Sequence, residues 1–362
     1  MSIFLGKSVF PPARQHPRRS ELLKDSEEYF LKHWPFETEA ARQHFCRSIL
    51  ADYVAKTVPD TEHWEKLVFA ARAVTWAFLL DDMVEVKATF KSMPDLLQVI
   101  YGNKKPNPDL YWEVVTDDIW RGIQRGCTAV EFDQMTCTVK EWYISHGQPI
   151  PDSFDGWLIH RHHDCGANWV WAFSRYAMEC RVTDEDLTHP AVRKAEDSAA
   201  VTCFLVNDIV SFPKDKMDNR EELNGVSMIR KYGLASTEEQ ALDKISDIIV
   251  QRTRQFTESI NQALADPTLS SDMKQWMMAL PYAVSGNSWW GQLTARYNFP
   301  GLPAPRMTIN MEGQGDIIEP APFADLEFDK LVDGVLFPVQ KANVPAYYPE
   351  ALTDKHSTTV IE

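Results

Sequence analysis

Apolar residues recur every three or four positions along most of this chain, as in helices that pack one face against a core. Between positions 242 and 264 the apolar face consists of Leu242, Ile245, Ile249, Phe256, Ile260 and Leu264, and Asp266-Pro267 follows as a stop signal. Similar periodicity predicts helices over about 39–57, 62–87, 109–128, 130–146, 190–215 and 271–298. Alternating strand patterns are scarce. The pattern therefore predicts an all-α bundle of roughly ten helices.

The two ends of the chain lack this periodicity. Residues 1–35 are rich in Pro and Arg and are expected to form an irregular N-terminal arm. Residues 300–362 are expected to form a Pro/Gly-rich C-terminal tail that wraps the domain or is partly free. A single α-helical domain over 36–299 lies between them, and it contains no internal repeat.

The composition favours a protein with an apolar cavity, and the net charge limits the partners that the protein can bind. The 362 residues are 44% hydrophobic and include 12 Trp and 18 Phe, which suits a globular protein with an apolar cavity. The net charge of −15 repels phosphodiester backbones, so we expect no nucleic-acid partner. An anionic substrate would need metal ions or a few well-placed Arg and Lys side chains to offset this charge.

The cysteines and the N-terminus bear on the cellular compartment. None of the six cysteines forms a CxxC pair, and the stretch MSIFLGKSVFPPARQHPRRS has too short an apolar core for a secretory signal. No apolar run approaches the length of about 18 residues that a membrane span needs. We expect a soluble, cytoplasmic protein with reduced thiols and no membrane span.

The stretch AVTWAFLLDDMVE, residues 73–85, places acids at the end of an apolar helix. Asp81 and Glu85 lie about 40° apart around the helix axis, with Asp82 beside them. Unpaired, the three carboxylates would repel one another, and Mg²⁺ would remove that repulsion. The alternative is a solvated helix end, the interpretation that we favour for the similar pair Asp117-Asp118.

A second polar patch, VNDIVSFPKDK, ends the apolar run AAVTCFLV. Asn207, Ser211 and Asp215 drift by only about 40° per step and form a stripe along one helix face. Amide, hydroxyl and carboxylate oxygens are hard ligands that suit Mg²⁺, and Lys214 could reach a phosphate. The alternative is a polar face turned to solvent. Pro213 removes a helical hydrogen bond, so we expect a kink or an early helix end that draws Asp215 toward the metal.

With both patches in view, the sequence resembles a class I terpene synthase of the microbial, fungal-type sesquiterpene cyclase kind. The pattern NDxxSxxxD/E is matched by Asn207-Asp208, Ser211 and Asp215, although the family usually has Glu at the last position. An Arg-Tyr pair near the end of the helical region, Arg296-Tyr297, matches the pair that hydrogen-bonds diphosphate in the family.

The resemblance extends to the segment HRHHDCGANW and covers about residues 40–299. It implies that Arg161 senses diphosphate, that Asp164 relays closure of the site, and that Cys165-Gly166 is a helix break facing the substrate. His160, His162 and His163 with Asp164 could instead suggest a His-rich metal site or a metal phosphohydrolase. We disfavour that alternative because no further set of His and Asp ligands is evident.

The resemblance implies a central apolar cavity and a lyase that acts on farnesyl diphosphate, a small allylic diphosphate. Ionisation would lead to carbocation cyclisation and release of diphosphate and a cyclic C15 hydrocarbon or alcohol. Three Mg²⁺ ions would be held by Asp81, Glu85, Asn207, Ser211 and Asp215. Arg161, Lys214, Arg296 and Tyr297 would bind the diphosphate. A homodimer is compatible with the resemblance.

Aromatic side chains near both motifs could stabilise the cation left in the cavity. The best candidates are Phe78 and Trp290, with Trp76 and Trp289 as second choices; packing in the core is the alternative for each. Two other functions remain open. A chain-elongating prenyl diphosphate synthase shares the fold but uses two DDxxD motifs, and an inactive helical scaffold would release no diphosphate. The C15 substrate is expected from the length of a single domain, with C10 and C20 substrates as alternatives.

Overall fold

A computed structural model describes residues 3–4, 11, 13–84, 95–146, 148–218, 221–297 and 307–308. The α-helices are α1 (Arg19–His33), α2 (Glu39–Ser48), α3 (Asp52–Thr57), α4 (Trp64–Val84), α6 (Leu96–Tyr101), α7 (Tyr111–Arg125), α8 (Ala129–Ser145), α9 (Phe154–Asp164), α10 (Ala167–Met178), α11 (Asp184–Thr188), α12 (Pro190–Met217), α13 (Gly225–Lys231), α14 (Glu238–Ala265) and α15 (Ser271–Leu293). A 3₁₀ turn, η1 (Glu221–Leu223), precedes α13. The strands β1 (Ile3–Phe4) and β2 (Met307–Thr308) form one short parallel pair.

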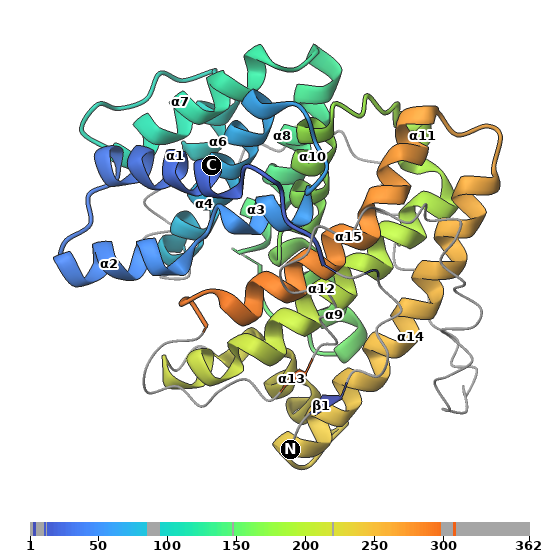
Figure 1. The fold of residues 1–362 in the computed structure, drawn as a ribbon. Helices are drawn as coiled ribbons and strands as arrows, with labels where there is room; N and C mark the ends of the chain where they lie inside the picture. The colour runs from blue at the N-terminus through green and yellow to red at the C-terminus, as the bar shows by residue number, and fades with distance from the viewer. Residues whose placement is uncertain are drawn as a thin grey trace.

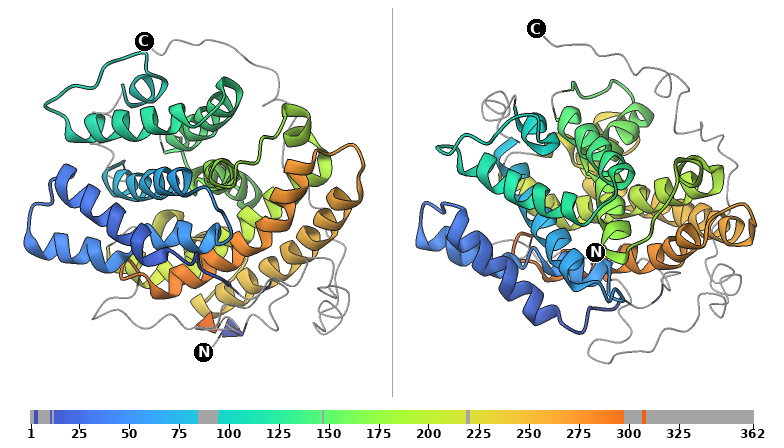
Figure 2. Two further views of the ribbon diagram at one scale, coloured as in Figure 1. Left: turned by 45° about the horizontal axis from the view of Figure 1, so that its top comes forward. Right: turned by 90° about the horizontal axis from the view of Figure 1, so that it is seen from above.

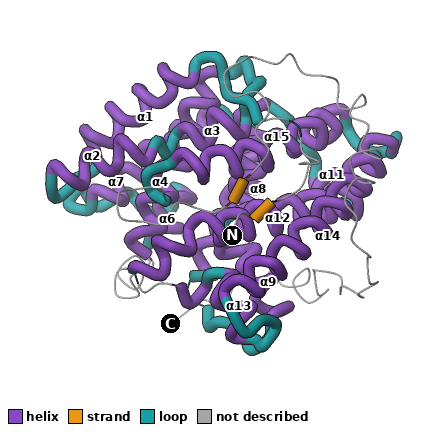
Figure 3. Tube along the Cα trace, turned by 60° about the horizontal axis from the view of Figure 1, so that its bottom comes forward, coloured by secondary structure: helices purple, strands orange, loops and turns teal. Residues whose placement is uncertain are grey.

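The helices form one bundle built around α12 (Figure 1). Helices α14 and α15 lie along α12, and α10 joins α12 to α4 and α8 (Figure 2). Helix α4 packs between α1, α3 and α7. Figure 3 colours helices and strands differently and shows that the strands are confined to one short pair. Within the described residues the expected all-α architecture is therefore confirmed. No helix among these residues combines the length and the apolar composition that a membrane crossing requires.

The expectation of an irregular arm over residues 1–35 is wrong for α1. Leu22, Ser26 and Phe30 are buried at steps of four residues, which gives α1 one inward face. Ser26 Oγ lies 3.2 Å from Thr75 Oγ1 of α4. The sequence pattern did not reveal this helix because its inward stripe is narrow and includes a serine. The predicted tail over 300–362 lies outside the described residues except for β2.

One predicted helix is divided into two, and another ends earlier than predicted. The segment 39–57 is divided into α2 and α3 because the chain turns at Ile49, whose φ of 44° is left-handed. The helix predicted over 271–298 ends at Leu293. There Thr294 Oγ1 donates a hydrogen bond to the carbonyl of Ser48 at 2.6 Å, so the chain beyond α15 is tied to the end of α2.

Of the two outcomes expected at Pro213, a kink or an early helix end, the early end is wrong. Helix α12 contains Pro213 and continues to Met217. The missing N–H leaves one helical hydrogen bond unmade, but the following residues keep helical geometry. Asp215 therefore reaches its neighbours from a continuing helix.

Helices α3 and α15 approach closely at Gly286. A β-carbon at this position would lie 2.2 Å from the carbonyl oxygen of Lys56, which is backbone and cannot rotate away. We expect Gly286→Ala to lower the free energy of unfolding by about 1–3 kcal/mol, as measured by chemical denaturation.

Gly291→Ala in the same helix is the matched control for this variant. Its new methyl group would meet only a side-chain methyl of Val210 at 3.3 Å, and alanine favours a helix over glycine by about 1 kcal/mol. Equal stability of the two variants would contradict the close approach of α3 and α15.

Candidate active site

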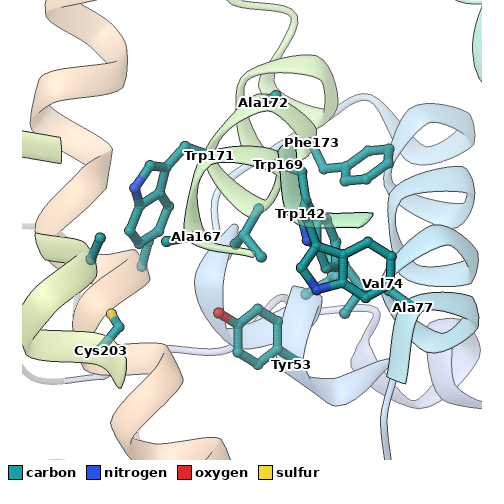
Figure 4. Packing of buried hydrophobic residues seen from close by; sticks show 14 of the residues in the cluster. Tyr53, Val74, Ala77, Trp142, Ala167, Trp169, Trp171, Ala172, Phe173 and Cys203 are labelled. Atoms are coloured by element: carbon teal, nitrogen blue, oxygen red, sulfur yellow. The ribbon is translucent and has the colours of Figure 1, made fainter. Parts of the chain in front are cut away.

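A cavity of about 130 Å³ lies where α3, α4, α8, α9, α10, α12 and α15 meet. Its walls are mainly aromatic and aliphatic, and Figure 4 shows Tyr53, Trp142, Trp169 and Trp171 around this space. Eight residues that the sequence singled out also line it: Phe78, Asp81, Arg161, Asp164, Cys165, Asn207, Trp290 and Tyr297. The fold therefore brings one residue of each motif, Asp81 and Asn207, and both predicted aromatic residues to one cavity.

The end of α4 supplies the acidic side of the site. Asp81 Oδ2 accepts a hydrogen bond from Arg296 at 3.2 Å, and Asp82 Oδ2 accepts another from the same guanidinium at 2.8 Å. Asp81 Oδ1 lies 3.4 Å from His146 Nε2. Glu85, the third predicted acid, lies outside the described residues.

His146, which the sequence motifs did not single out, lies between two carboxylates. Its Nδ1 faces the carbonyl of Trp142 at 2.9 Å, and its Nε2 lies 4.0 Å from Asp164 as well as near Asp81. Burial lowers the pKa of His146, but the hydrogen bond to Asp81 and the charge of Asp164 outweigh it and raise the pKa to about 9. The imidazolium therefore donates at both nitrogens near neutral pH.

The pKa of Asp81 is affected by opposing interactions. Burial raises it, but the hydrogen bond from His146 and the charge of Arg296 have a larger combined effect and leave the pKa below its ordinary value. Asp81 is thus an anion at neutral pH, as a metal ligand has to be.

The second motif lies on the cavity side of α12. Asn207 lines the cavity, and its Nδ2 donates to the hydroxyl of Tyr297 at 3.0 Å. One turn on, Ser211 donates to Asp215 Oδ2 at 2.7 Å. The predicted stripe is therefore continuous along the helix, although Ser211 and Asp215 lie beyond the cavity wall itself.

The oxygen atoms that this stripe could offer as metal ligands suit a hard divalent cation. They consist of an amide oxygen, a hydroxyl and a carboxylate, which match the preference of Mg²⁺ for oxygen ligands. No group of three or more His, Cys, Asp or Glu side chains that could hold a metal occurs within the described ranges. In a ligand set of Asn207, Ser211 and Asp215, only Asp215 is one of these four residue types, so such a set is compatible with the absence of a larger cluster among the described residues.

Arg161 is held between two carboxylates at the α9 edge of the cavity. It donates to Asp164 Oδ2 at 2.6 Å and to Asp208 Oδ1 at 2.8 Å. Burial disfavours its charge, but Asp208 and Asp164 raise the pKa of Arg161 well above the ordinary value. Within the described part of the chain, Nε of Arg161 and Nε of Arg296 are buried donors without a hydrogen-bond partner. Two cations with spare donors therefore flank one cavity.

The predicted helix break at Cys165-Gly166 is confirmed. Helix α9 ends at Asp164 and α10 begins at Ala167. Gly166 between them has a φ of +71°, and a β-carbon there would lie 2.0 Å from Trp169 Nε1. Only glycine fits this turn, which directs Arg161 and Asp164 to the same cavity as the aromatic residues of α10.

Phe78 and Trp290 form one aromatic wall. Their rings stack with centroids 4.9 Å apart, and Tyr53 meets Trp290 edge-on at 5.3 Å. The second choices, Trp76 and Trp289, do not line the cavity. Trp76 donates to Thr116 Oγ1 at 2.7 Å, and Trp289 packs against the ammonium group of Lys56 at 4.1 Å. For Trp76, which is buried, the core-packing alternative holds, whereas Trp289 is half-buried and lies outside the hydrophobic core cluster.

The sequence also suggested Lys214 and the histidines of HRHHD as ligand-binding groups. These residues, Lys214, His160, His162 and His163, do not line the cavity. Lys214 pairs with Asp218 at 3.2 Å. His162 Nε2 contacts Asn168 Oδ1 at 3.0 Å, and His163 Nδ1 lies 3.8 Å from Glu141. These histidines have separate partners, which argues against a His-rich metal site.

The charge of His146 makes a testable contribution to stability. The pKa of about 9 in the folded protein exceeds the ordinary value of 6.5, so the stabilisation is complete below pH 6.5 and is lost as pH rises through 9. In the absence of Mg²⁺, we expect the stability difference between wild type and His146→Gln to shrink by up to about 3 kcal/mol over this range, as followed by denaturant unfolding. A difference that stays constant or grows would contradict the assignment.

Comparison with known proteins places this geometry in a family. The family model for terpene synthase family 2, C-terminal metal binding, matches residues 72–255. Aristolochene synthase from Aspergillus terreus is 24% identical over 312 residues, which cover 80% of this chain and 93% of that protein. Aristolochene synthase from Penicillium roqueforti is 23% identical over 312 residues, covering 80% and 89%.

Solved structures show the same fold. The crystal structure of aristolochene synthase from Penicillium roqueforti matches with a TM-score of 0.67 at 22% identity, over 79% of this chain and 99% of that one. Hedycaryol synthase in complex with HEPES matches with a TM-score of 0.67 at 18% identity, over 78% and 94%. The fold is that of the class I terpenoid synthases, and the match over residues 72–255 shows that this chain belongs to terpene synthase family 2.

Proposed function

We propose that the protein is a magnesium-dependent sesquiterpene cyclase that ionises farnesyl diphosphate and releases diphosphate with a cyclic C15 hydrocarbon or alcohol. The observation that carries this proposal is the shared cavity, which Asp81 of α4 and Asn207 of α12 line together with Arg161 and Tyr297. The aristolochene synthases that match most of the chain support a C15 substrate.

Magnesium would be held on two sides of the cavity entrance. Asp81 of α4, together with Glu85, would bind it on one side, and Asn207, Ser211 and Asp215 of α12 on the other, with three ions expected in all. When bound, the metal supplies positive charge that stabilises the departing diphosphate. The shorter Asp215, in place of the usual Glu, is compatible with this role because its carboxylate already lies beside Ser211.

The chain's own cations would hold the diphosphate. Arg161 and Arg296 each keep a buried Nε without a partner, and a phosphate oxygen is a suitable acceptor for such a donor. Tyr297, which lines the cavity, adds a hydroxyl. Lys214, next to Asp215 on α12, adds positive charge. These groups orient the leaving group as the allylic C–O bond breaks and its electron pair passes to the diphosphate oxygen.

The apolar wall would then keep the carbocation from water. Phe78 and Trp290 line the cavity as a stacked pair, and a cation above an aromatic ring face is stabilised by up to about 2 kcal/mol when desolvated. The guanidinium of Arg296 lies 5.4 Å from the centre of the Phe78 ring, so the diphosphate site and the aromatic wall adjoin. Movement of Asp164 with Arg161 would couple binding of the diphosphate to closure.

The substrate can be tested directly. We expect farnesyl diphosphate with Mg²⁺, and no isopentenyl diphosphate, to yield a cyclic C15 product that gas chromatography–mass spectrometry detects. A requirement for isopentenyl diphosphate would point to the chain-elongating alternative. Absence of Mg²⁺-dependent diphosphate release from geranyl, farnesyl and geranylgeranyl diphosphates would point to the inactive scaffold.

The metal assignment is tested by Asp81→Asn. Loss of this carboxylate removes an anionic ligand from the cavity, so we expect kcat to fall about 100-fold or more, with an unchanged circular-dichroism spectrum. The control is Asp117→Asn, which alters the other Asp-Asp pair, on α7, where Asp117 faces Arg121 at 3.4 Å. Asn207→Ala should behave as Asp81→Asn does, and full activity in either variant would overturn the metal assignment.

A further inference from the structure

Asn224 lies in the turn between η1 and α13 and contacts the candidate metal ligands of α12 from outside the cavity. Its side chain is 3% exposed. The amide nitrogen Nδ2 is 2.9 Å from Asp215 Oδ2, 3.3 Å from Ser211 Oγ and 2.9 Å from the backbone carbonyl of Asp208. The buried amide of Asn224 therefore contacts two residues of the stripe, Ser211 and Asp215, and also the backbone of the residue that follows Asn207.

The orientation of this amide follows from its second contact. The oxygen Oδ1 accepts a hydrogen bond from the backbone N–H of Val226 at 3.0 Å, which makes Asn224 the N-cap of α13. An N–H group at that position would face another N–H, so the amide cannot be reversed. Nδ2 must then be the group that points to Asp215.

The turn that carries Asn224 is itself fixed to α12. Asp208 Oδ2 accepts the backbone N–H of Gly225 at 2.9 Å, while Asp208 Oδ1 binds Arg161. A β-carbon at Gly225 would lie 2.9 Å from that carboxylate and 3.2 Å from Trp157, so the backbone approaches as closely as packing allows. Asn224 is therefore held at a set distance from the stripe.

These contacts determine which atoms of the stripe stay available to a metal. Ser211 and Asn224 both donate to Oδ2 of Asp215, and neither bond uses Oδ1. The Ser211 proton points to Asp215 and one lone pair of Ser211 Oγ faces the Asn224 amide, which leaves one lone pair of this oxygen for a metal. A side chain that orients a ligand in this way typically changes metal affinity by about 10- to 100-fold when it is removed.

We propose that Asn224 is a positioning residue for the magnesium ligands Ser211 and Asp215. It would do so by donating its amide hydrogens to Asp215 Oδ2 and to the Asp208 carbonyl while Val226 fixes its orientation. This inference rests on the proposed function, because it assumes that the stripe on α12 binds magnesium.

The test separates the cap of α13 from the bonds to the ligands. Asn224→Ser keeps a good N-cap residue but loses the amide donors. Binding of inorganic diphosphate is measured by isothermal titration calorimetry at a series of Mg²⁺ concentrations, which requires no turnover. We expect the half-saturating Mg²⁺ concentration to rise about tenfold or more in Asn224→Ser, with little change in Tm.

Thr237→Ala is the matched control, because it removes the N-cap of α14, where Thr237 accepts the N–H of Gln240, and leaves Asn224 in place. It should lower Tm without changing the half-saturating Mg²⁺ concentration. In an Asp215→Asn background, replacing Asn224 by Ser should raise that concentration by less than twofold, since the ligand through which Asn224 acts has been altered.

The outcomes separate this inference from the proposed function. If wild type binds diphosphate independently of Mg²⁺, the metal assignment on α12 fails and the inference with it. If wild type requires Mg²⁺ and Asn224→Ser has the same half-saturating concentration, only the inference is overturned. Should Asn224→Ser fail to fold, Asn224→Asp replaces it, because aspartate keeps the N-cap of α13 and cannot donate to Asp215. If the half-saturating Mg²⁺ concentration of Asn224→Asp equals that of wild type, the inference is overturned.

Discussion

Carboxylates and guanidinium groups pair at one end of an apolar cavity, and the arrangement of the surrounding helices depends on this pairing. Arg296 joins the chain after α15 to Asp81 and Asp82 of α4, and Arg161 joins α9 to Asp208 of α12. Buried charges are costly unless they are paired, so these contacts restrict how the helix ends can meet. The same pairing concentrates cations and anions where a metal–diphosphate complex would carry both.

The backbone breaks that place these groups follow from local geometry. Gly166 allows the left-handed turn between α9 and α10, and Ile49 forms a similar turn between α2 and α3. After α15, Thr294 bonds to Ser48 and so brings Arg296 and Tyr297 toward the cavity instead of extending the helix. Each break ends a helix near the cavity or near the segment that supports it, so side chains from several helices converge.

The acidic character of the chain is compatible with binding of an anion because the potential inside the site is set locally. The net charge is −15, yet Arg161, Arg296 and His146 carry positive charge at the cavity, and burial reduces screening by solvent. Beyond this charged end, Phe78, Trp290 and Tyr53 form an aromatic wall. In the proposed reaction this wall would stabilise a cation and keep it from water. The two environments lie next to each other, as ionisation followed by cyclisation requires.

Sequence patterns alone were enough to predict the helical fold and the family, and they pointed to Asp81, Asn207, Arg161 and Tyr297, which the fold brings to one cavity. Helical periodicity and motif spacing are local properties, so they can be read without knowing the packing. The Asn-Ser-Asp stripe was visible because residues four positions apart share one helix face.

The groups that surround these motifs come from distant parts of the chain and became evident only in the folded structure. His146 lies far along the chain from Asp81, and Asn224 belongs to a turn after α12, so their contacts depend on helix packing that no local pattern records. The sequence ranked Trp290 above Trp289, and the structure supplies the reason: Trp290 lines the cavity, whereas Trp289 beside it packs on Lys56. Adjacent residues on a helix point about 100° apart, and only the packing of neighbouring helices decides which direction leads to the cavity.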